Sequence, residues 1–251
     1  LGKKLLNRYA SKLKGSIAVS ETSKRFVEEF IPSDYKIIPN GISVDEFKHS
    51  EPFEEYKDGK INILFLSRME KRKGLQYLLS AYSDLKWDFP DTRLIIVGGG
   101  NMDAESHSII GSRNPADIVF IGEVSDSDKA RYYKTADIFC APATGQESFG
   151  IVLLEAMAAG TAIAASRIEG FSNVVEDDRN SLMFSPKNVE SLRNVLTKLI
   201  SDQKLRDRLS RSGSMDVFRY NWDTVASEVV DYYQQLGAIS PELDVINLTT
   251  G

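Results

Sequence analysis

The chain has 251 residues, of which 42% are hydrophobic and 27% are charged, a balance typical of a folded globular protein and not of a disordered chain or a fibre. Its 31 basic and 36 acidic residues give a net charge of −5, which argues against nucleic acid as the main partner, because binding to phosphates needs a basic surplus. The single cysteine, Cys140, excludes an intramolecular disulfide and fits a reducing compartment.

The beginning of the chain is strongly basic. Residues 1–20 contain five cations and no acid, and leucine and tyrosine recur at helical spacing over residues 2–14. This pattern predicts a basic amphipathic helix, which is either a domain helix with a solvated basic face or a helix attracted to anionic lipid. No apolar run approaches the roughly 18 residues of a membrane span. Because the chain begins with Leu1, we expect it to be a piece of a longer protein.

The next segment predicts one small α/β unit. Residues 17–19 and 35–38 are short apolar runs that predict two strands, and they flank a helical pattern at about 21–30. Pro39-Asn40-Gly41 then breaks the chain. Residues 48–60 are polar, charged and irregular, so we expect a linker between two domains over 41–60.

From residue 61 onward, apolar runs alternate with helical patterns. The patterns at 74–88 and 188–201 each carry one apolar stripe. Such alternation predicts the α/β class, with a doubly wound, Rossmann-like parallel sheet covered on both faces, over residues 61–220. A last helix is expected at 222–236, and residues 239–251 show no period. The six predicted strands are 61–66, 93–97, 118–121, 137–140, 162–165 and 182–184.

Ligands of doubly wound sheets bind beyond the carboxyl ends of the strands. The loop after the first strand, 67–74, is rich in cations and runs into a helix, which favours an anion site. Arg68 and Lys73 are spaced to bracket a diphosphate, although a solvated turn with surface charges remains the alternative. Glycines 98–100 follow the second strand and let backbone approach a ligand closely. They do not complete a dinucleotide fingerprint, and the chain has no Walker loop.

The loop after the fourth strand is the most informative one. It leads into a helix at about 150–159 that is apolar on every side except at Glu155. Such a helix is buried, and a buried carboxylate is costly unless it is hydrogen-bonded, for example by sugar or ribose hydroxyls. Glu147 lies just before the helix. The two acids therefore indicate a nucleotide-sugar site, with pairing of Glu155 to a Lys or Arg inside the protein as the alternative.

The stretch from Glu147 to Glu155 fits the Glu-x7-Glu motif of retaining GT-B glycosyltransferases. The run 141–160 resembles family 4 of these enzymes, and in particular their phosphatidylinositol mannosyltransferase branch. The resemblance spans nearly the whole chain in the right order. It also covers residues 39–42, 68–74, 97–100 and 122–124.

The resemblance implies a role for each of these residues. Arg68 and Lys73 would hold the donor diphosphate, and Glu147 would bind hydroxyls of the donor sugar, so these three form the expected catalytic group. Glu155 would hold the ribose. The backbone N–H groups expected to face sugar and phosphate are those of Ser148, Phe149, Gly150 and Ile151. The residues expected to line the base are Gly122, Glu123 and Val124, although the sequence there also reads as an ordinary capped helix start.

The chain departs from the family pattern in one respect. The resemblance implies a second Rossmann-like domain on the acceptor side, of which only the last α/β unit, residues 1–40, is recognisable. Residues 221–238 would be the helix that returns to that domain, and 239–251 a tail. His49 and His107 do not match the catalytic histidine that the missing part supplies. We therefore expect this chain alone to bind a donor but to lack transferase activity.

The expected function is hexosyl transfer with retention, from a nucleotide-diphosphate sugar, with GDP-mannose as the candidate, to a lipid or saccharide acceptor. No tightly bound cofactor, protein metal site or nucleic acid is expected, and a need for a divalent metal is left open. Unpaired strand edges predict self-association through residues 1–40. The expected location is the cytoplasm, with peripheral contact at the inner membrane face. The alternatives are a non-catalytic nucleotide-sugar-binding module and a nucleotide-sugar epimerase on the same fold.

Overall fold

The computed structural model describes residue 10 and residues 12–238. These residues form two compact units. The larger unit is 44–217, and the smaller one combines the described residues up to 43 with those from 218 onward. The helix expected at 2–14 falls mostly outside the described residues, and the tail expected at 239–251 falls entirely outside them.

The larger unit is built on a parallel sheet of six strands in the order β5-β4-β3-β6-β7-β8. The order reverses between β3 and β6, which are neighbours in space although two other strands separate them in the sequence. This is the doubly wound arrangement that the alternating pattern predicts. The strands are β3 (Ile61–Leu66), β4 (Thr92–Val97), β5 (Ile118–Gly122), β6 (Ile138–Ala141), β7 (Ala162–Ser166) and β8 (Leu182–Phe184).

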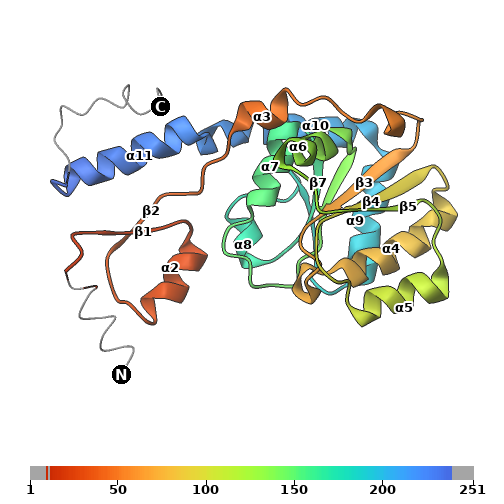
Figure 1. Ribbon diagram of the computed structural model, residues 1–251, viewed down its shortest axis with the longest axis horizontal. Coiled ribbons are helices and arrows are strands. Elements are labelled where there is room, and N and C mark those ends of the chain that lie inside the picture. The colour runs from red at the N-terminus through yellow and green to blue at the C-terminus, as the bar shows by residue number, and fades with distance from the viewer. Residues whose placement is uncertain (1–9, 11, 239–251) are drawn as a thin grey trace. The chain divides into compact units, whose positions relative to one another are not determined.

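Helices cover both faces of this sheet (Figure 1). On one face α4 packs against α5 and α9, and on the other α7 packs against α3, α6 and α10. Successive strand residues point to opposite faces, and both faces are buried, as Phe65 and Phe139 show. The helices are α3 (Val44–Lys48), α4 (Leu75–Asp88), α5 (Ala104–Arg113), α6 (Asp126–Thr135), α7 (Ile151–Ala159), α8 (Glu169–Ser172), α9 (Val189–Ser201) and α10 (Gln203–Asp216). Short 3₁₀ turns are η1 (Glu54–Tyr56) and η2 (Lys71–Lys73).

The smaller unit contains the predicted α/β element. Its two parallel strands are β1 (Ser16–Ala18) and β2 (Tyr35–Ile37), and α2 (Glu21–Glu28) joins them. Ser20 begins α2 with a capping box, which satisfies two backbone N–H groups at once. The described part of the unit ends with α11 (Trp222–Gln235), preceded by the 3₁₀ turn η3 (Val217–Tyr220).

Two stretches of the larger unit differ from the expectation. Part of the predicted linker, 41–60, folds onto this unit instead, because Val44 and Phe47 of α3 are buried and Phe47 packs edge-on against Tyr133. Helix α10 has no counterpart among the predicted elements. It is mostly polar and buries only Leu209 and Gly213.

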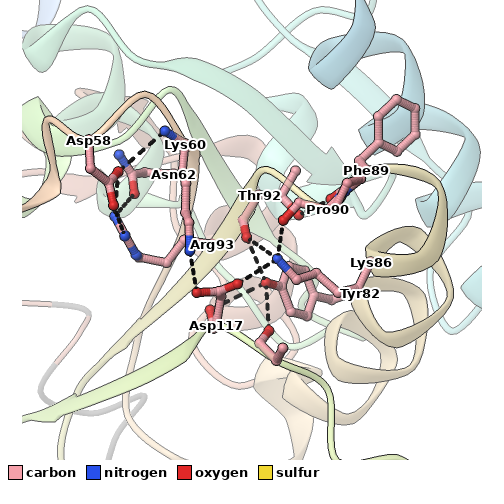
Figure 2. Close-up of polar contacts among 11 residues, drawn as sticks. Asp58, Lys60, Asn62, Tyr82, Lys86, Phe89, Pro90, Thr92, Arg93 and Asp117 are labelled. Atoms are coloured by element: carbon pink, nitrogen blue, oxygen red, sulfur yellow. Dashed lines mark hydrogen bonds and ion pairs between the residues drawn. The ribbon is translucent and has the colours of Figure 1, made fainter.

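The amino ends of β3, β4 and β5 are joined by a polar network (Figure 2). Asp117 accepts hydrogen bonds from Lys60 at 2.5 Å and from Lys86 at 2.7 Å. The hydroxyl of Tyr82 donates to the backbone around the same point, including the carbonyl oxygen of Thr92 at 3.1 Å. Burial raises the pKa of Tyr82 to about 12. This network joins three strands at the amino edge of the sheet, which is opposite to the predicted site.

A candidate donor site at the carboxyl edge of the sheet

The loops after β3 and β6 meet at the point where the strand order reverses. The backbone N–H of Thr144, in the loop after β6, donates to the carbonyl oxygen of Arg72 at 2.8 Å. Gly74 makes this approach possible, because its φ is +78° and a Cβ there would lie 2.0 Å from the carbonyl oxygen of Pro142. The two loops predicted to carry the ligand are therefore in direct contact, at the place where doubly wound sheets bind ligands.

Glu147 is paired with two cations of the loop after β3. Its Oε1 lies 2.6 Å from Nζ of Lys73 and 2.7 Å from Nη1 of Arg72. The predicted pair of Lys73 and Glu147 is thus brought together, and both residues line one hollow between the ends of β3 and β6. Arg72 belongs to the cationic loop, but no role was predicted for it.

Arg68 lies on the same loop but does not contact Glu147. Its guanidinium is 3.0 Å from Oε1 of Glu70, and its side chain is 75% exposed. Glu70 also accepts a hydrogen bond from Nε of Arg72 at 2.8 Å. The loop therefore carries three cations that two carboxylates, Glu70 and Glu147, hold in one connected network.

Helix α7 begins immediately after this network. Its amino end has no side-chain cap, and Gly150 forms the N-cap. Ser148, Phe149, Gly150 and Ile151, the residues expected to present backbone N–H groups, therefore lie at the helix end where the partial positive charge of the macrodipole favours an anion. Cations and a helix amino end together make this edge suitable for a diphosphate.

Glu155 is buried in α7 and is paired inside the protein. Only 6% of the residue is exposed. Its Oε1 lies 2.9 Å from Nζ of Lys129, and its Oε2 accepts a hydrogen bond from the hydroxyl of Tyr133 at 2.9 Å. The structure therefore shows the pairing inside the protein that the sequence offers as the alternative for Glu155. A carboxylate has about four acceptor positions, so these two bonds still leave room for further donors.

The charges around Glu155 shift the pKa values of its partners. Burial disfavours the charged ammonium of Lys129, but the carboxylates of Glu155 and Asp126 outweigh it and raise the pKa of Lys129. Burial and the negative charge of Glu155 raise the pKa of Tyr133 well above its ordinary value. Lys129 is thus a cation and Tyr133 a neutral donor at neutral pH. In the sequence, the i, i+4 spacing of Lys129 and Tyr133 on one face of α6 is the pattern that could have identified both residues.

The segment Gly122 to Val124 lies where β5 ends, beside the glycine loop after β4. The backbone N–H of Gly98 donates to the carbonyl oxygen of Gly122 at 2.8 Å. The carboxylate of Glu123 lies against Gly99, so the two loops share one surface. Ser125 then caps α6, accepting from the N–H of Asp128 at 3.1 Å, which agrees with the capped helix start.

The remaining reactive residues lie elsewhere. His49 follows α3 and faces Asp45 at 3.7 Å, and His107 lies on α5. Cys140 is buried in β6, and its burial raises the pKa of the thiol. Within residues 12–238 no group of three or more potential metal ligands converges. No helix in the described part of the chain is long and apolar enough to cross a membrane.

Comparisons with known proteins identify the family of this chain. The family model for glycosyl transferases group 1 matches residues 46–215. The chain is 37% identical, over 246 residues, to a phosphatidyl-myo-inositol mannosyltransferase of Mycobacterium tuberculosis; the match covers 96% of this chain and 65% of that protein. The chain therefore spans about two thirds of the length of this curated relative.

Two solved structures show the same fold. One is an Anabaena protein in complex with UDP and glucose, with a TM-score of 0.81 and 19% identity over 93% of this chain and 66% of that one. The other is the C-terminal domain of a group 1 glycosyl transferase from Francisella tularensis, with a TM-score of 0.63 and 25% identity. That domain is matched over its whole length by 72% of this chain. The predicted fold, a Rossmann-like sheet of the GT-B type, is thereby confirmed.

Proposed function

This chain belongs to the glycosyl transferases group 1 family, and from that premise we propose that it is the donor-binding part of a hexosyltransferase that uses a nucleotide-diphosphate sugar and retains the anomeric configuration. The observation that carries the proposal is the contact of Glu147 with Lys73 and Arg72 where the strand order reverses. It supports the proposal because a carboxylate that can accept hydrogen bonds from sugar hydroxyls lies beside Lys73, a cation that can bind a diphosphate.

The diphosphate would lie between the cationic loop and the amino end of α7. Lys73 and Arg68 are its proposed ligands, and the N–H groups at the start of α7 add a partial positive charge. As the bond from the sugar to the diphosphate breaks, negative charge grows on the leaving oxygen. Fixed cations and dipoles stabilise such charge more in the transition state than in the ground state, which accelerates transfer.

The rest of the donor would extend toward α6. In this proposal the carboxylate of Glu155 accepts hydrogen bonds from ribose hydroxyls, while Lys129 and Tyr133 keep it in place. The base would lie against Gly122 to Val124. Support for this placement comes from the order of the loops along the sheet, because the loops after β4 and β5 share one surface.

The relatives suggest the sugar and the acceptor. The name of the mycobacterial relative supports transfer of mannose to a phosphatidylinositol lipid, with GDP-mannose as the donor. A lipid acceptor would bring the whole protein to the cytoplasmic face of a membrane. Since the chain spans 65% of that relative, we propose that the chain by itself binds the donor and that it transfers sugar only together with an acceptor-side domain. A transfer assay with and without that domain tests this.

A thermal-shift panel tests the donor class. The panel contains GDP-mannose, UDP-glucose and ADP-glucose, with inorganic pyrophosphate as the control for a bare anion site. A ligand at a hundredfold excess over its dissociation constant stabilises the folded protein by about 2.7 kcal/mol. We expect one nucleotide sugar to raise the unfolding temperature more than pyrophosphate does. The proposal would be contradicted if none of the three nucleotide sugars raised the unfolding temperature, or if pyrophosphate raised it equally.

A further inference from the structure

Arg72 connects the two loops of the candidate site through both its backbone and its side chain. Its carbonyl oxygen accepts from N–H and Oγ1 of Thr144 at 2.8 and 3.2 Å. Its Nη1 donates to Oε1 of Glu147 at 2.7 Å and to the carbonyl oxygen of Gln146 at 3.2 Å. Its Nε donates to Glu70 at 2.8 Å. The guanidinium is therefore fixed by three oxygen atoms, and its side chain is only 28% exposed.

The two cations on Glu147 share one of its oxygen atoms. Lys73 and Arg72 both donate to Oε1, and no described residue donates to Oε2. One oxygen is thus held by the protein while the other is free to accept. This asymmetry matters because a carboxylate that binds sugar hydroxyls needs both a fixed orientation and an open acceptor.

A diphosphate that binds beside Lys73 would compete with Glu147 for its ammonium. An ammonium is a compact point charge on a flexible stem, so it turns readily toward a stronger anion, whereas a planar guanidinium held at several points keeps its geometry. When a diphosphate binds, Lys73 would turn to it and weaken its contact with Glu147. Arg72 would then be the main cation that keeps Glu147 in place.

We propose that Arg72 is a positioning residue that holds Glu147 toward the donor sugar after Lys73 has turned to the diphosphate. The proposal rests on the proposed function of the site. In this proposal the two neighbouring cations act on different parts of the donor. Lys73 binds the diphosphate, and Arg72 acts on the sugar by positioning Glu147. Bare nucleoside diphosphate and nucleotide sugar should therefore respond differently to the two substitutions.

Calorimetric titration of the chain with GDP, GDP-mannose, UDP and UDP-glucose tests this difference. Arg72→Ala should leave the affinity for the bare diphosphate within about twofold of the original and weaken the matching nucleotide sugar about tenfold. Arg72→Lys should recover part of the loss, because an ammonium can still reach Glu147. Lys73→Ala should weaken both ligands together.

Four results would overturn the proposal. Equal weakening of both ligands in Arg72→Ala would make Arg72 a diphosphate ligand, and unchanged affinity for both would make it dispensable for Glu147. If Arg72→Ala loses its cooperative thermal transition, the affinities of Arg72→Lys for the bare diphosphate and for the nucleotide sugar are compared instead. If the original chain binds none of the four ligands, or if Lys73→Ala changes nothing, the proposed function itself fails, and the role of Arg72 fails with it.

Discussion

Glu147 and Glu155 differ in their surroundings, and this difference separates their proposed roles. Glu147 lies in a loop, where Lys73 and Arg72 donate to its Oε1. Glu155 lies inside α7 and is held by Lys129 and Tyr133. A substitution at Glu147 should therefore change the contact with one part of the ligand, whereas a substitution at Glu155 should also disturb the protein around it.

Conservative substitutions of the two acids should affect the ligands unequally. Glu147→Gln should spare GDP and weaken GDP-mannose about tenfold, because the proposed contact is with the sugar. Glu155→Gln should weaken both ligands, because the ribose is common to them. Competition binding with a fluorescent GDP analogue measures both affinities. The same loss for both ligands in the two variants would mean that the assigned roles are wrong or that both acids are structural.

Asp117 contributes stability in a way that depends on pH. Hydrogen bonds from Lys60 and Lys86 lower its pKa from 3.8 to about 2 in the folded protein. Because the folded pKa lies below the unfolded one, the unfolded chain takes up a proton first as the pH falls. The stabilisation is therefore complete above about pH 4 and is lost as the pH falls through about 2.

Asp117→Asn should reproduce this loss at neutral pH. We expect it to lower the free energy of unfolding by about 1–3 kcal/mol at pH 7, and by clearly less at about pH 2.5, where the original carboxylate has lost most of its effect. Urea unfolding at the two pH values measures the difference. The matched control is Asp91→Asn, an exposed acid directly before β4. An equal loss at both pH values in Asp117→Asn would contradict this account.

At the scale of elements, the glycine loop after β4 makes room for the loop after β3. Gly98 has φ +138°, and a Cβ there would lie 1.9 Å from the carbonyl oxygen of Ser67. Gly98→Ala should therefore destabilise the protein by at least about 2 kcal/mol. The matched control is Gly111→Ala on α5, where a Cβ meets nothing within 4 Å; alanine should be neutral or stabilise by up to about 1 kcal/mol there. Thermal unfolding of both variants gives the comparison, and equal stability would refute it.

The six-stranded sheet was predictable because its strands, apart from the edge strand β5, are buried on both faces. Their apolar runs are continuous, so strand positions were predicted to within about one residue. The loops at the carboxyl edge then followed from the topology alone. Helix α10 escaped prediction because only one of its faces packs and its surface is polar. Helix α3 is five residues long and too short to show a period.

The contacts within the site could be predicted only in part. The acids and cations follow from the residue types after each strand. Which cation meets Glu147 depends on loop conformation, and the contact of Thr144 with Arg72 brings Arg72 to Glu147 while Arg68 turns to Glu70. The partners of Glu155 come from a neighbouring helix, so a pattern in α7 alone does not reveal them.

At the scale of the whole molecule, the described residues of the smaller unit leave apolar side chains and strand edges without a neighbour among themselves. Strands β1 and β2 each have only one neighbour within the described part of the chain. Phe26 and Phe30 on the α2 side are 67% and 45% exposed. Unpaired edges and exposed aromatic side chains favour association.

We therefore expect the chain to associate through residues 1–40. Light scattering should show a mass that rises with concentration, and deleting residues 1–40 should abolish the rise. Phe26→Ser should reduce it without changing the thermal transition. The shortened chain should still unfold cooperatively, because the core lies between Ile63 and Leu209. A monomer at every concentration would disprove the association, and loss of the transition would disprove the independence of the larger unit.

The central claim is that Lys73, at the reversal of the strand order, binds the diphosphate of a nucleotide-sugar donor. Calorimetric titration of GDP-mannose into the chain and its Lys73→Ala variant tests it most directly, with Lys204→Ala on α10 as a control for the loss of one surface charge. Since a hydrogen bond to a charged group contributes about 1.5–3 kcal/mol, we predict an affinity about 10 to 100 times weaker in Lys73→Ala and an unchanged affinity in Lys204→Ala. Equal affinities in all three proteins would contradict the claim.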